Sequence, residues 1–569
     1  MTTISEYYEE EYRYLLEGGK EFARFHPEQA KYLNLDDPRA RDPHVERLLE
    51  SFAFLAGRIH KRLDDEFPEI THALLSLIYS HYLCPIPSIS ILEFIPIKGR
   101  ISESNTIRRG VMVDSEPVEG IQCRFQTCYN VKLYPVSLIS ASILHSGGDN
   151  SISLRFVIEE GIQITDMGLD KIRLYLCGER AETYALYRLL SSQVEEILLH
   201  GDNDQTSKAK IKMVGFDEDE SVLLYPEYSF IGYRLLEEYF VFPEKFFFVD
   251  IYNLEALSLI NTASSFEIEI RLNSKVPAGL RVSAENFRLY CTPVINVFPK
   301  DAEPIQLDHS KSKYRVLADH LNPQNFEIYS VTSVEGIAID TGQRREYKPF
   351  YSFQHEEGED NENYYHLTRE VSPWDGWDTC ISFPPSLSNS NISLELLCTN
   401  GNLAKKVGIG DICRPTQDIP GFVRFSNITQ PTPSLRPKLG KGLEWKFISH
   451  LSLNFVSITS VKTLRKLLEI YNMGNTEANQ RKIAGITNVS VASEQILVYG
   501  APVKGMHISI TLDEKHFEDE GDVRLFACTL NEFVSLYSSI NSFTRLTVKC
   551  TGMEESLKWP PVVGKQSTM

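Results

Sequence analysis

The sequence contains no long apolar run and no leader-like beginning. None of its stretches reaches the roughly 18 uninterrupted apolar residues that suggest a membrane-spanning helix. The first residues, from Met1 to Glu11, are acidic and lack the apolar core of a secretory signal. We therefore expect no direct membrane insertion and predict a cytoplasmic location.

Cysteine and histidine at ligand spacing are also missing. The 569 residues include 10 Cys and 14 His, spread over the whole length. No C-x-x-C pair occurs, and the closest cysteines are Cys123 and Cys128. In a chain of this length the pattern is typical of buried free thiols in a reducing compartment. We predict no disulfide framework, no metal site and no cofactor.

Positive charge is scarce. There are 58 Lys and Arg against 77 Asp and Glu, a formal net charge of −19, which argues against binding to nucleic acid because phosphates attract Lys and Arg. Residues 431–485 depart from this trend, with nine basic and three acidic side chains. The segment is either a solvated face balanced by acidic neighbours or a docking surface for an acidic partner or a second copy.

Known catalytic signatures are absent as well. The chain has no G-x-S-x-G, no H-E-x-x-H and no phosphate-binding G-x-x-x-x-G-K-[ST]. The acidic triplet at residues 64–66 points in directions about 100° apart on a helix and cannot converge on one ion. The acidic stretch after His355 is interpreted as a solvated loop. Trp374 and Trp377 either cover a turn or form a sugar platform.

An N-terminal segment, residues 1–88, is predicted to be helical. After Asp42, a favourable N-cap, Pro43 occupies the first helical position, where its missing N–H costs nothing. Two other helices are predicted over residues 3–22 and 68–82. Apolar side chains in the central helix recur at helical spacing over about five turns, namely Val45, Leu48, Leu49, Phe52, Leu55, Ala56, Ile59 and Leu63.

That apolar stripe needs a cover, because three helices are too few to close a bundle alone. Either the chain's own β domains cover it or helices of a partner do. We hypothesise that a partner covers at least part of it.

Residues 89–430 form a β-rich middle region, sandwich-like or barrel-like and with two expected subdomains. Short β-branched and aromatic runs alternate there with Gly, Pro, Asn and Asp turns. Predicted strands are Ser90–Ile95, Ser151–Ile158, Ile172–Leu176, Phe246–Ile251, Phe266–Leu272 and Ser393–Cys398, with helices at Glu182–Leu190 and Phe230–Phe240.

A Pro-rich stretch, residues 431–437, is interpreted as a linker into a C-terminal α+β domain, residues 431–569. We expect helices at Ser460–Tyr471 and Thr529–Ser539, and strands at His507–Leu512 and Arg545–Lys549. The predicted fold class is therefore multi-domain α+β.

Several stretches, in order along nearly the whole chain, resemble the TssF family (VasA/ImpG-like) of type VI secretion system baseplate wedge proteins. They are YYEEEYRYL at 7–15, DPHVERLLESFAFLA at 42–56, LDDEFP at 63–68, HYLCPIPS at 81–88, GYRLLEEYF at 232–240, CTPVINVF at 291–298, CTNG at 398–401, residues 445–454, and INSF at 540–543.

This resemblance implies a structural subunit and not an enzyme. Two TssF copies would form a wedge with one TssG, dock TssK and support tube and sheath assembly, with TssE and other baseplate parts as further partners and the baseplate docked at the inner-membrane complex. The partner-interface residues we predict are Tyr8, Tyr12, Leu15, Val45, Leu48, Leu49, Phe52, Leu55, Ile59, Arg436, Lys438, Trp445 and Lys446.

The alternative function is a β-rich carbohydrate-binding protein or glycosidase. Two carboxylates distant in sequence can meet about 5–9 Å apart in a folded chain. A pocket with two facing carboxylates and a raised pKa would favour that alternative, and a broad apolar surface would favour the scaffold.

Overall fold

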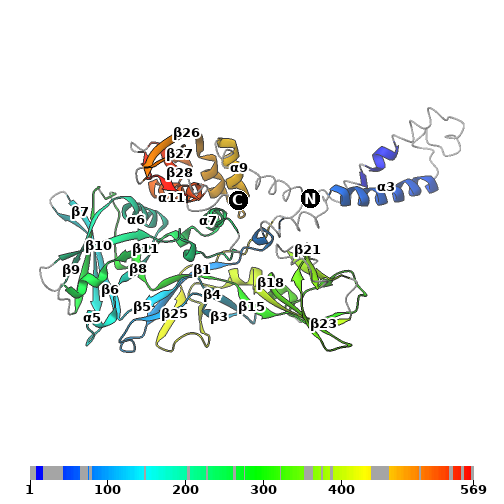
Figure 1. The fold of residues 1–569 in the computed structure, drawn as a ribbon, viewed down its shortest axis with the longest axis horizontal. Coiled ribbons are helices and arrows are strands. Elements are labelled where there is room, and N and C mark those ends of the chain that lie inside the picture. The colour runs from blue at the N-terminus through cyan, green and yellow to red at the C-terminus, as the bar shows by residue number, and fades with distance from the viewer. Residues whose placement is uncertain are drawn as a thin grey trace. The chain divides into compact units, whose positions relative to one another are not determined.

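The computed structural model describes residues 8–9, 11–16, 43–64, 75, 80–146, 149–201, 206–225, 229–259, 264–274, 276–277, 279–320, 322–350, 363–372, 376–384, 389–437, 460–498, 501–536, 538, 542–552 and 556–564 (Figure 1). The chain divides into two compact units. One comprises Met1–Leu83 with Lys438–Ser452, and the other comprises Cys84–Pro437 with Leu453–Met569.

The first unit is helical in its described residues. Helix α3 runs over Pro43–Asp64, so it begins at the proline, as predicted. Residues 11–16 form another helical stretch, and the 3-10 helix η1 covers Ser80–Leu83. The helix predicted over residues 68–82 lies mostly outside the described residues.

The second unit contains a six-stranded antiparallel sheet that receives strands from three separate parts of the chain. Its spatial order is β24 (Ile412–Pro415), β3 (Met112–Val118), β4 (Ile121–Thr127), β14 (Cys291–Ile295), β1 (Ile89–Pro96) and β25 (Val423–Asn427). The two end strands are tied together, because the Ile412 and Gly410 amides each donate to Asn427 at 2.9 Å. The sheet is thus barrel-like.

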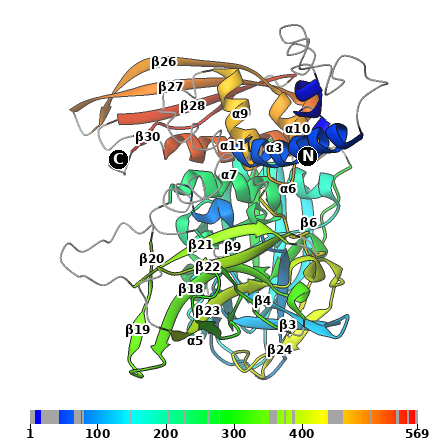
Figure 2. The same cartoon turned by 90° about the vertical axis from the view of Figure 1, so that its right-hand side faces the viewer.

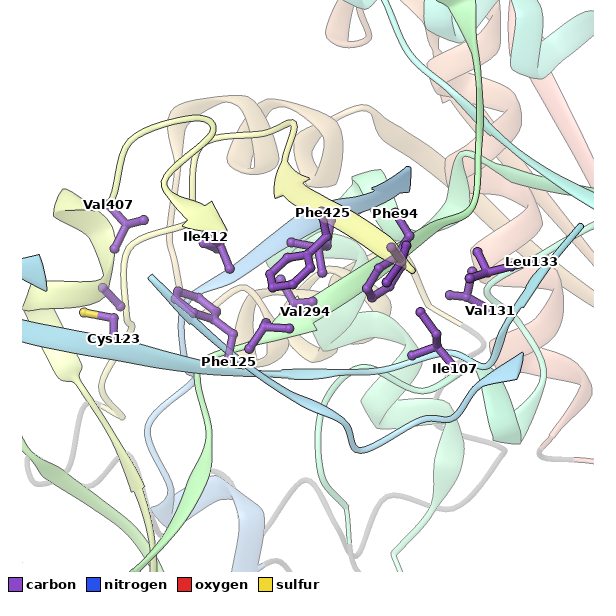
Figure 3. Packing of buried hydrophobic residues seen from close by; sticks show 14 of the residues in the cluster. Phe94, Ile107, Cys123, Phe125, Val131, Leu133, Val294, Val407, Ile412 and Phe425 are labelled. Atoms are coloured by element: carbon purple, nitrogen blue, oxygen red, sulfur yellow. The ribbon is translucent and has the colours of Figure 1, made fainter. Parts of the chain in front are cut away.

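The core of this sheet follows from the alternation of its strands. Along β4, Cys123 and Phe125 are buried and Arg124 between them is exposed, as the two-residue period of a strand requires. Figure 3 shows Phe125 beside the paired rings of Phe94 and Phe425, whose centroids are 5.8 Å apart. The small pair β2 (Asn105–Ile107) and β5 (Val131–Leu133) adds to this cluster.

Residues 136–289 lie between two strands of that sheet and build a separate eight-stranded antiparallel sheet. Its order is β13 (Phe287–Leu289), β8 (Lys171–Leu176), β11 (Phe248–Tyr252), β10 (Thr206–Met213), β9 (Val194–His200), β12 (Ser265–Leu272), β7 (Asp149–Ile158) and β6 (Val136–Ser146). Helices α6 (Arg180–Ser192) and α7 (Ile231–Val241) belong to the same part of the chain.

Residues 298–399 are a second insertion, and they form a β-sandwich. One sheet contains β15 (Phe298–Asp301), β16 (Ile305–Leu307), β18 (Glu327–Ala338), β19 (Arg344–Glu346) and β23 (Ser390–Thr399), and the other contains β17 (Tyr314–Arg315), β20 (Lys348–Pro349), β21 (Tyr364–Val371) and β22 (Trp377–Ser382). Val334 and Leu394 of the first sheet share one core with Tyr365 and Ile381 of the second.

The C-terminal part is α+β, which confirms the predicted fold class together with the β-rich middle. Helices α9 (Val461–Tyr471), α10 (Glu477–Ala484) and α11 (Glu520–Ser535) accompany a sheet of β26 (Ile486–Val498), β27 (Ala501–Asp513), β28 (Ser542–Thr551), β29 (Leu557–Lys558) and β30 (Val562–Val563). Figure 2 shows β26, β27 and β28 side by side. The first pair is antiparallel and the second parallel.

The C-terminal helices pack on the helices of the middle region. Tyr233 of α7 stacks on Tyr471 of α9, with ring centroids 4.7 Å apart. Gly521 of α11 lies so close to α6 that a Cβ there would come within 2.2 Å of the Tyr184 carbonyl oxygen, so only glycine fits. These contacts join residues 460–564 to the middle region within one compact unit.

Several predicted elements differ from the structure in their bounds, and the predicted linker differs in its contacts. The strand expected at Phe246–Ile251 begins at Phe248, because Pro243 opens a 3-10 helix, η3, over Pro243–Phe246. The helix expected at Thr529–Ser539 begins at Glu520, because the Asp519 side chain accepts from the Asp522 amide at 2.8 Å and caps it. The predicted linker, residues 431–437, is extended but bound, since Leu435 and Ile86 exchange two backbone hydrogen bonds of 2.7 and 2.9 Å.

Candidate partner interface

The apolar residues of α3 form two rows with different surroundings. At 100° per residue, Leu49 and Ala53 fall on one side of the helix, and Leu48, Phe52 and Leu55 fall on the other. Ala53 is fully buried and Leu49 is partly buried. We call Leu48, Phe52 and Leu55 the outer row.

The buried side of α3 faces the first helical stretch of the same unit. The Tyr12 hydroxyl donates to the Glu46 carboxylate at 3.4 Å, and Tyr8 stacks on Tyr12 with ring centroids 5.8 Å apart. Tyr8, Tyr12, Leu15, Val45 and Leu49 are all partly buried. These predicted interface residues therefore have part of their surface covered within the chain.

The outer row is open. Leu48 is 72% exposed, Phe52 is 59% exposed and Leu55 is 57% exposed. Burying such a side chain is worth about 1.5–3 kcal/mol, so three in one row form a surface that gains from a cover. Ile59 falls on the same row by its position in α3, and its side chain lies outside the described residues.

The basic segment contributes one described interface candidate. Arg436 donates to Glu327 at 2.8 Å, and its guanidinium lies against Gly376, where a Cβ would come within 2.6 Å of it. The other three candidates, Lys438, Trp445 and Lys446, lie outside the described residues. Arg436 thus has an ion pair within the chain, and its role at an interface stays a prediction.

Two carboxylates on α7 are buried, and both have protein partners. Glu238 accepts from the amides of Val222 and Leu223 at 2.7 and 2.9 Å and from the Lys245 ammonium at 2.5 Å. Burial lowers the pKa of Lys245, and the adjacent Glu238 opposes that shift. This ion pair stabilises the packing of α7 against the 3-10 helix η3, which precedes β11.

The neighbouring Glu237 has a different environment. Burial raises the pKa of its carboxyl to about 7, against a hydrogen bond from the Tyr225 hydroxyl and with a further rise from Glu238. None of the three described cavities is lined by Glu237 or Glu238. The burial of these two carboxyl groups is therefore a consequence of how α7 packs, and it does not mark a ligand site.

One cavity of about 800 Å³ opens at the start of α6. Its lining includes the carboxylates Glu179, Glu182, Glu244 and Glu285 and the arginines Arg180, Arg281 and Arg288. Burial raises the pKa of Glu244, while Arg180 pairs with Glu518 at 3.0 Å and Arg288 with Glu93 at 3.6 Å. The alternative function, a carbohydrate-binding or glycosidase site, stays a prediction, and this cavity would be its location. Trp377 is partly buried in β22, and Trp374 lies outside the described residues.

Two further searches cover only the described part of the chain. No group of three His, Cys, Asp or Glu side chains there could hold a metal ion. No helix there has both the length and the apolar character needed to cross a membrane.

Sequence reasoning missed two features of the surface. It treated the α3 stripe as one set, although the spacing of Leu48, Phe52 and Leu55 against Leu49 and Ala53 already separates two sides. It also missed the long strand β26, whose alternation of Val489 and Val491 with Ser490 is a usable signal.

The comparisons with known proteins agree with one another. The family model described as "Type VI secretion system, TssF" matches residues 1–566. A curated relative, the type VI secretion system component TssF1 of Pseudomonas aeruginosa, is 28% identical over 100% of this chain and 99% of its own length.

Solved structures show the same likeness. A chain in the cryo-electron microscopy structure of the type VI secretion system TssK-TssF-TssG baseplate subcomplex has a TM-score of 0.80 and 30% identity, covering 91% of this chain and 98% of that one. A chain in the baseplate complex of the type VI secretion system has a TM-score of 0.63 and 25% identity, with both chains covered fully, at 100% each.

Proposed function

Because this chain belongs to the TssF family of the type VI secretion system and is a structural subunit of its baseplate, we propose that it binds its TssG partner through the outer row of α3. The observation that carries the proposal is the exposure of Leu48, Phe52 and Leu55 on one side of a single helix. An amphipathic partner helix covers such a row by placing its own apolar residues at the same spacing.

The proposal includes further partners. TssG and TssK accompany the similar chain in the solved subcomplex, and we propose both for this chain, with a second copy of it and TssE as additional neighbours. We place the protein in the cytoplasm, in a baseplate docked at the inner-membrane complex. We assign it no enzymatic activity.

The same proposal assigns a separate role in the baseplate to each of the three regions of the chain. Residues 1–88 would make the partner contact, residues 89–430 would supply the bulk of the wedge, and residues 431–569 would complete it. The basic residues Lys438 and Lys446 would add contacts to an acidic part of a partner.

Co-purification with TssG tests the apolar contact. Leu48→Asp and Phe52→Asp each place a carboxylate in the buried centre of the proposed interface, where an unpaired charge costs several kcal/mol. We expect either variant to lose TssG when the two proteins are co-expressed and separated by size exclusion with mass measurement.

Phe54→Asp is the matched control. Phe54 is 45% exposed on the same helix, and it projects about 160° away from Phe52. This variant should retain TssG. Retention of TssG by a folded Leu48→Asp protein, or equal loss with Phe54→Asp, contradicts the assignment.

A further inference from the structure

The outer row of α3 belongs to a longer series with the spacing of a seam between two helices. The series follows intervals of three, four, three and four residues, through Val45, Leu48, Phe52, Leu55 and Ile59. This is the spacing at which the side chains of one helix insert between those of a second helix. The cover that fits the outer row is therefore another helix.

The charged residues of α3 lie in two pairs around that seam. Of residues 43–58, whose side chains the structure describes, four are charged. At 100° per residue, Arg47 and Arg58 both lie about 100° from the centre of the outer row. Glu46 and Glu50 lie about 150° or more from that centre. The arginines thus border the outer row, and the glutamates lie behind it.

The glutamates face residues of the same chain. The Tyr12 hydroxyl donates to Glu46 at 3.4 Å. Burial and the nearby charge of Glu50 both raise the pKa of the Tyr8 hydroxyl, so Glu50 lies beside Tyr8. The acidic side of α3 is therefore the side next to the first helical stretch.

The arginines, in contrast, face outward. Arg47 and Arg58 are exposed, and neither forms an ion pair with another described residue. Ser51 lies between them on the same border, and its short side chain donates to the Arg47 carbonyl at 2.7 Å. Eleven residues separate the two arginines, which is about 16.5 Å along a helix. The open border of the outer row therefore carries two positive charges, about three turns apart.

We propose that the helix covering the outer row carries Asp or Glu residues along the flank that meets Arg47 and Arg58. This inference rests on the proposed contact between α3 and TssG, and it adds the chemistry of the partner helix. That helix has apolar residues at intervals of three and four, and two carboxylates about 16 Å apart beside them. Charges at the flanks of a helix pair select the partner and its direction, because like charges placed together repel.

The α3 helix of a second copy does not offer this chemistry. In a symmetric antiparallel pair of α3 helices, the same flanks meet, so Arg47 and Arg58 of one copy face the arginines of the other. In a parallel pair they face the opposite border of the seam, which carries Leu49 and Ala56. Neither arrangement brings a carboxylate to the arginines, so the charges favour a different, acidic helix.

Reversing both charges tests the proposal. The Arg47→Glu/Arg58→Glu variant places carboxylates opposite the acidic flank of the partner. We expect it to bind purified TssG about tenfold or more weakly than the wild-type chain in 0.1 M NaCl, measured by microscale thermophoresis with the full chain. In 0.5 M NaCl the difference should fall below about threefold, because salt screens exposed charges. A loss of binding caused by misfolding would not shrink in this way.

Glu50→Lys is the control for charge reversal on the same helix. Glu50 lies behind the outer row, so this variant should bind TssG within about threefold of the wild-type chain at both salt concentrations. Circular dichroism of all variants confirms that their helices are intact.

Phe52→Asp separates this inference from the contact on which it rests. If Phe52→Asp loses TssG and the double arginine variant binds as tightly as the wild-type chain, the α3 contact stands and the acidic flank is wrong. If Phe52→Asp retains TssG, the contact itself is wrong, and the inference fails with it.

Three other results would overturn the acidic flank. They are an equal loss of binding with Glu50→Lys, a loss with the double arginine variant that is the same in 0.5 M NaCl, and tighter binding by that variant. Light scattering of the chain alone adds a fourth. A wild-type dimer that Phe52→Asp converts to a monomer would mean that a second copy covers the outer row.

Discussion

At the scale of single residues, ionisable groups inside the second unit are held by specific partners. Glu238 and Lys245 are fully buried and form an ion pair at 2.5 Å, and the Lys482 ammonium pairs with the buried Asp522 at 2.5 Å. Removing one partner of such a pair leaves an uncompensated charge, which costs far more than an exposed ion pair is worth. Among the described residues no cation pairs with Glu237, whose carboxylate accepts a hydrogen bond from the Tyr225 hydroxyl.

The raised pKa of Glu237 makes the stability of the protein depend on pH. In the unfolded chain the carboxyl has its ordinary pKa of 4.5, and in the folded chain burial raises the pKa to about 7. Between these values the folded state holds a proton that the unfolded state has released, so this group lowers stability as pH rises from 4.5 to about 7.

Glu237→Gln removes that dependence. Relative to the wild-type protein, the free energy of unfolding of this variant should rise by about 2–4 kcal/mol between pH 5 and pH 8. Urea unfolding at both pH values measures the difference. A constant difference across the range would mean that Glu237 titrates normally in the folded chain.

At the scale of elements, the β-sandwich is attached to the six-stranded sheet by two buried asparagines. The backbone N–H of Asn400 donates to Asn296 Oδ1 at 2.7 Å, and the side-chain Nδ2 of Asn296 donates to Asn400 Oδ1 at 2.8 Å. Asn296 Nδ2 also donates to the Arg124 carbonyl at 2.7 Å. Asn296 and Asn400 lie where the chain enters and leaves the inserted sandwich, residues 298–399. Their hydrogen bonds therefore hold the two connecting segments next to each other.

Asn296→Ala should destabilise the second unit. The Asn400 amide and the Arg124 carbonyl lose their partner in a buried site, and each unsatisfied group costs about 1–3 kcal/mol. Asn391→Ala, at an exposed position on β23, is the control and should change stability by less than about 0.5 kcal/mol. Chemical unfolding of both variants decides the matter, and equal midpoints would show that the asparagine pair contributes nothing.

At the scale of the whole molecule, the two compact units differ in what they contain. The described residues of the first unit include the exposed side chains Leu48, Phe52 and Leu55 of α3, and the second unit contains the sheets with their own cores. An independent core is what lets part of a chain fold alone.

A chain shortened to residues 84–569 should therefore keep the strand-rich circular dichroism and the cooperative unfolding of the second unit. It should fail to co-purify with TssG, because it lacks the outer row of α3. Full retention of TssG by the shortened chain would place the contact elsewhere, and loss of cooperative unfolding would mean that the second unit needs residues 1–83 in order to fold.

The sequence by itself determined the local structure and the family. Pro43 marked the start of α3, the Leu464 and Leu468 spacing marked α9, and motifs spread along the whole chain identified the TssF relationship. These signals are local because capping, helical period and strand alternation act over a few residues.

Only the tertiary structure decided what each apolar face meets. The helical period showed that α3 has apolar residues, but it did not show that Ala53 is buried and that Leu48 is exposed. It also did not reveal that three distant parts of the chain share one barrel-like sheet. Both depend on long-range packing and register, which periodicity does not encode: it shows which side of an element is apolar, and the folded chain decides what covers that side.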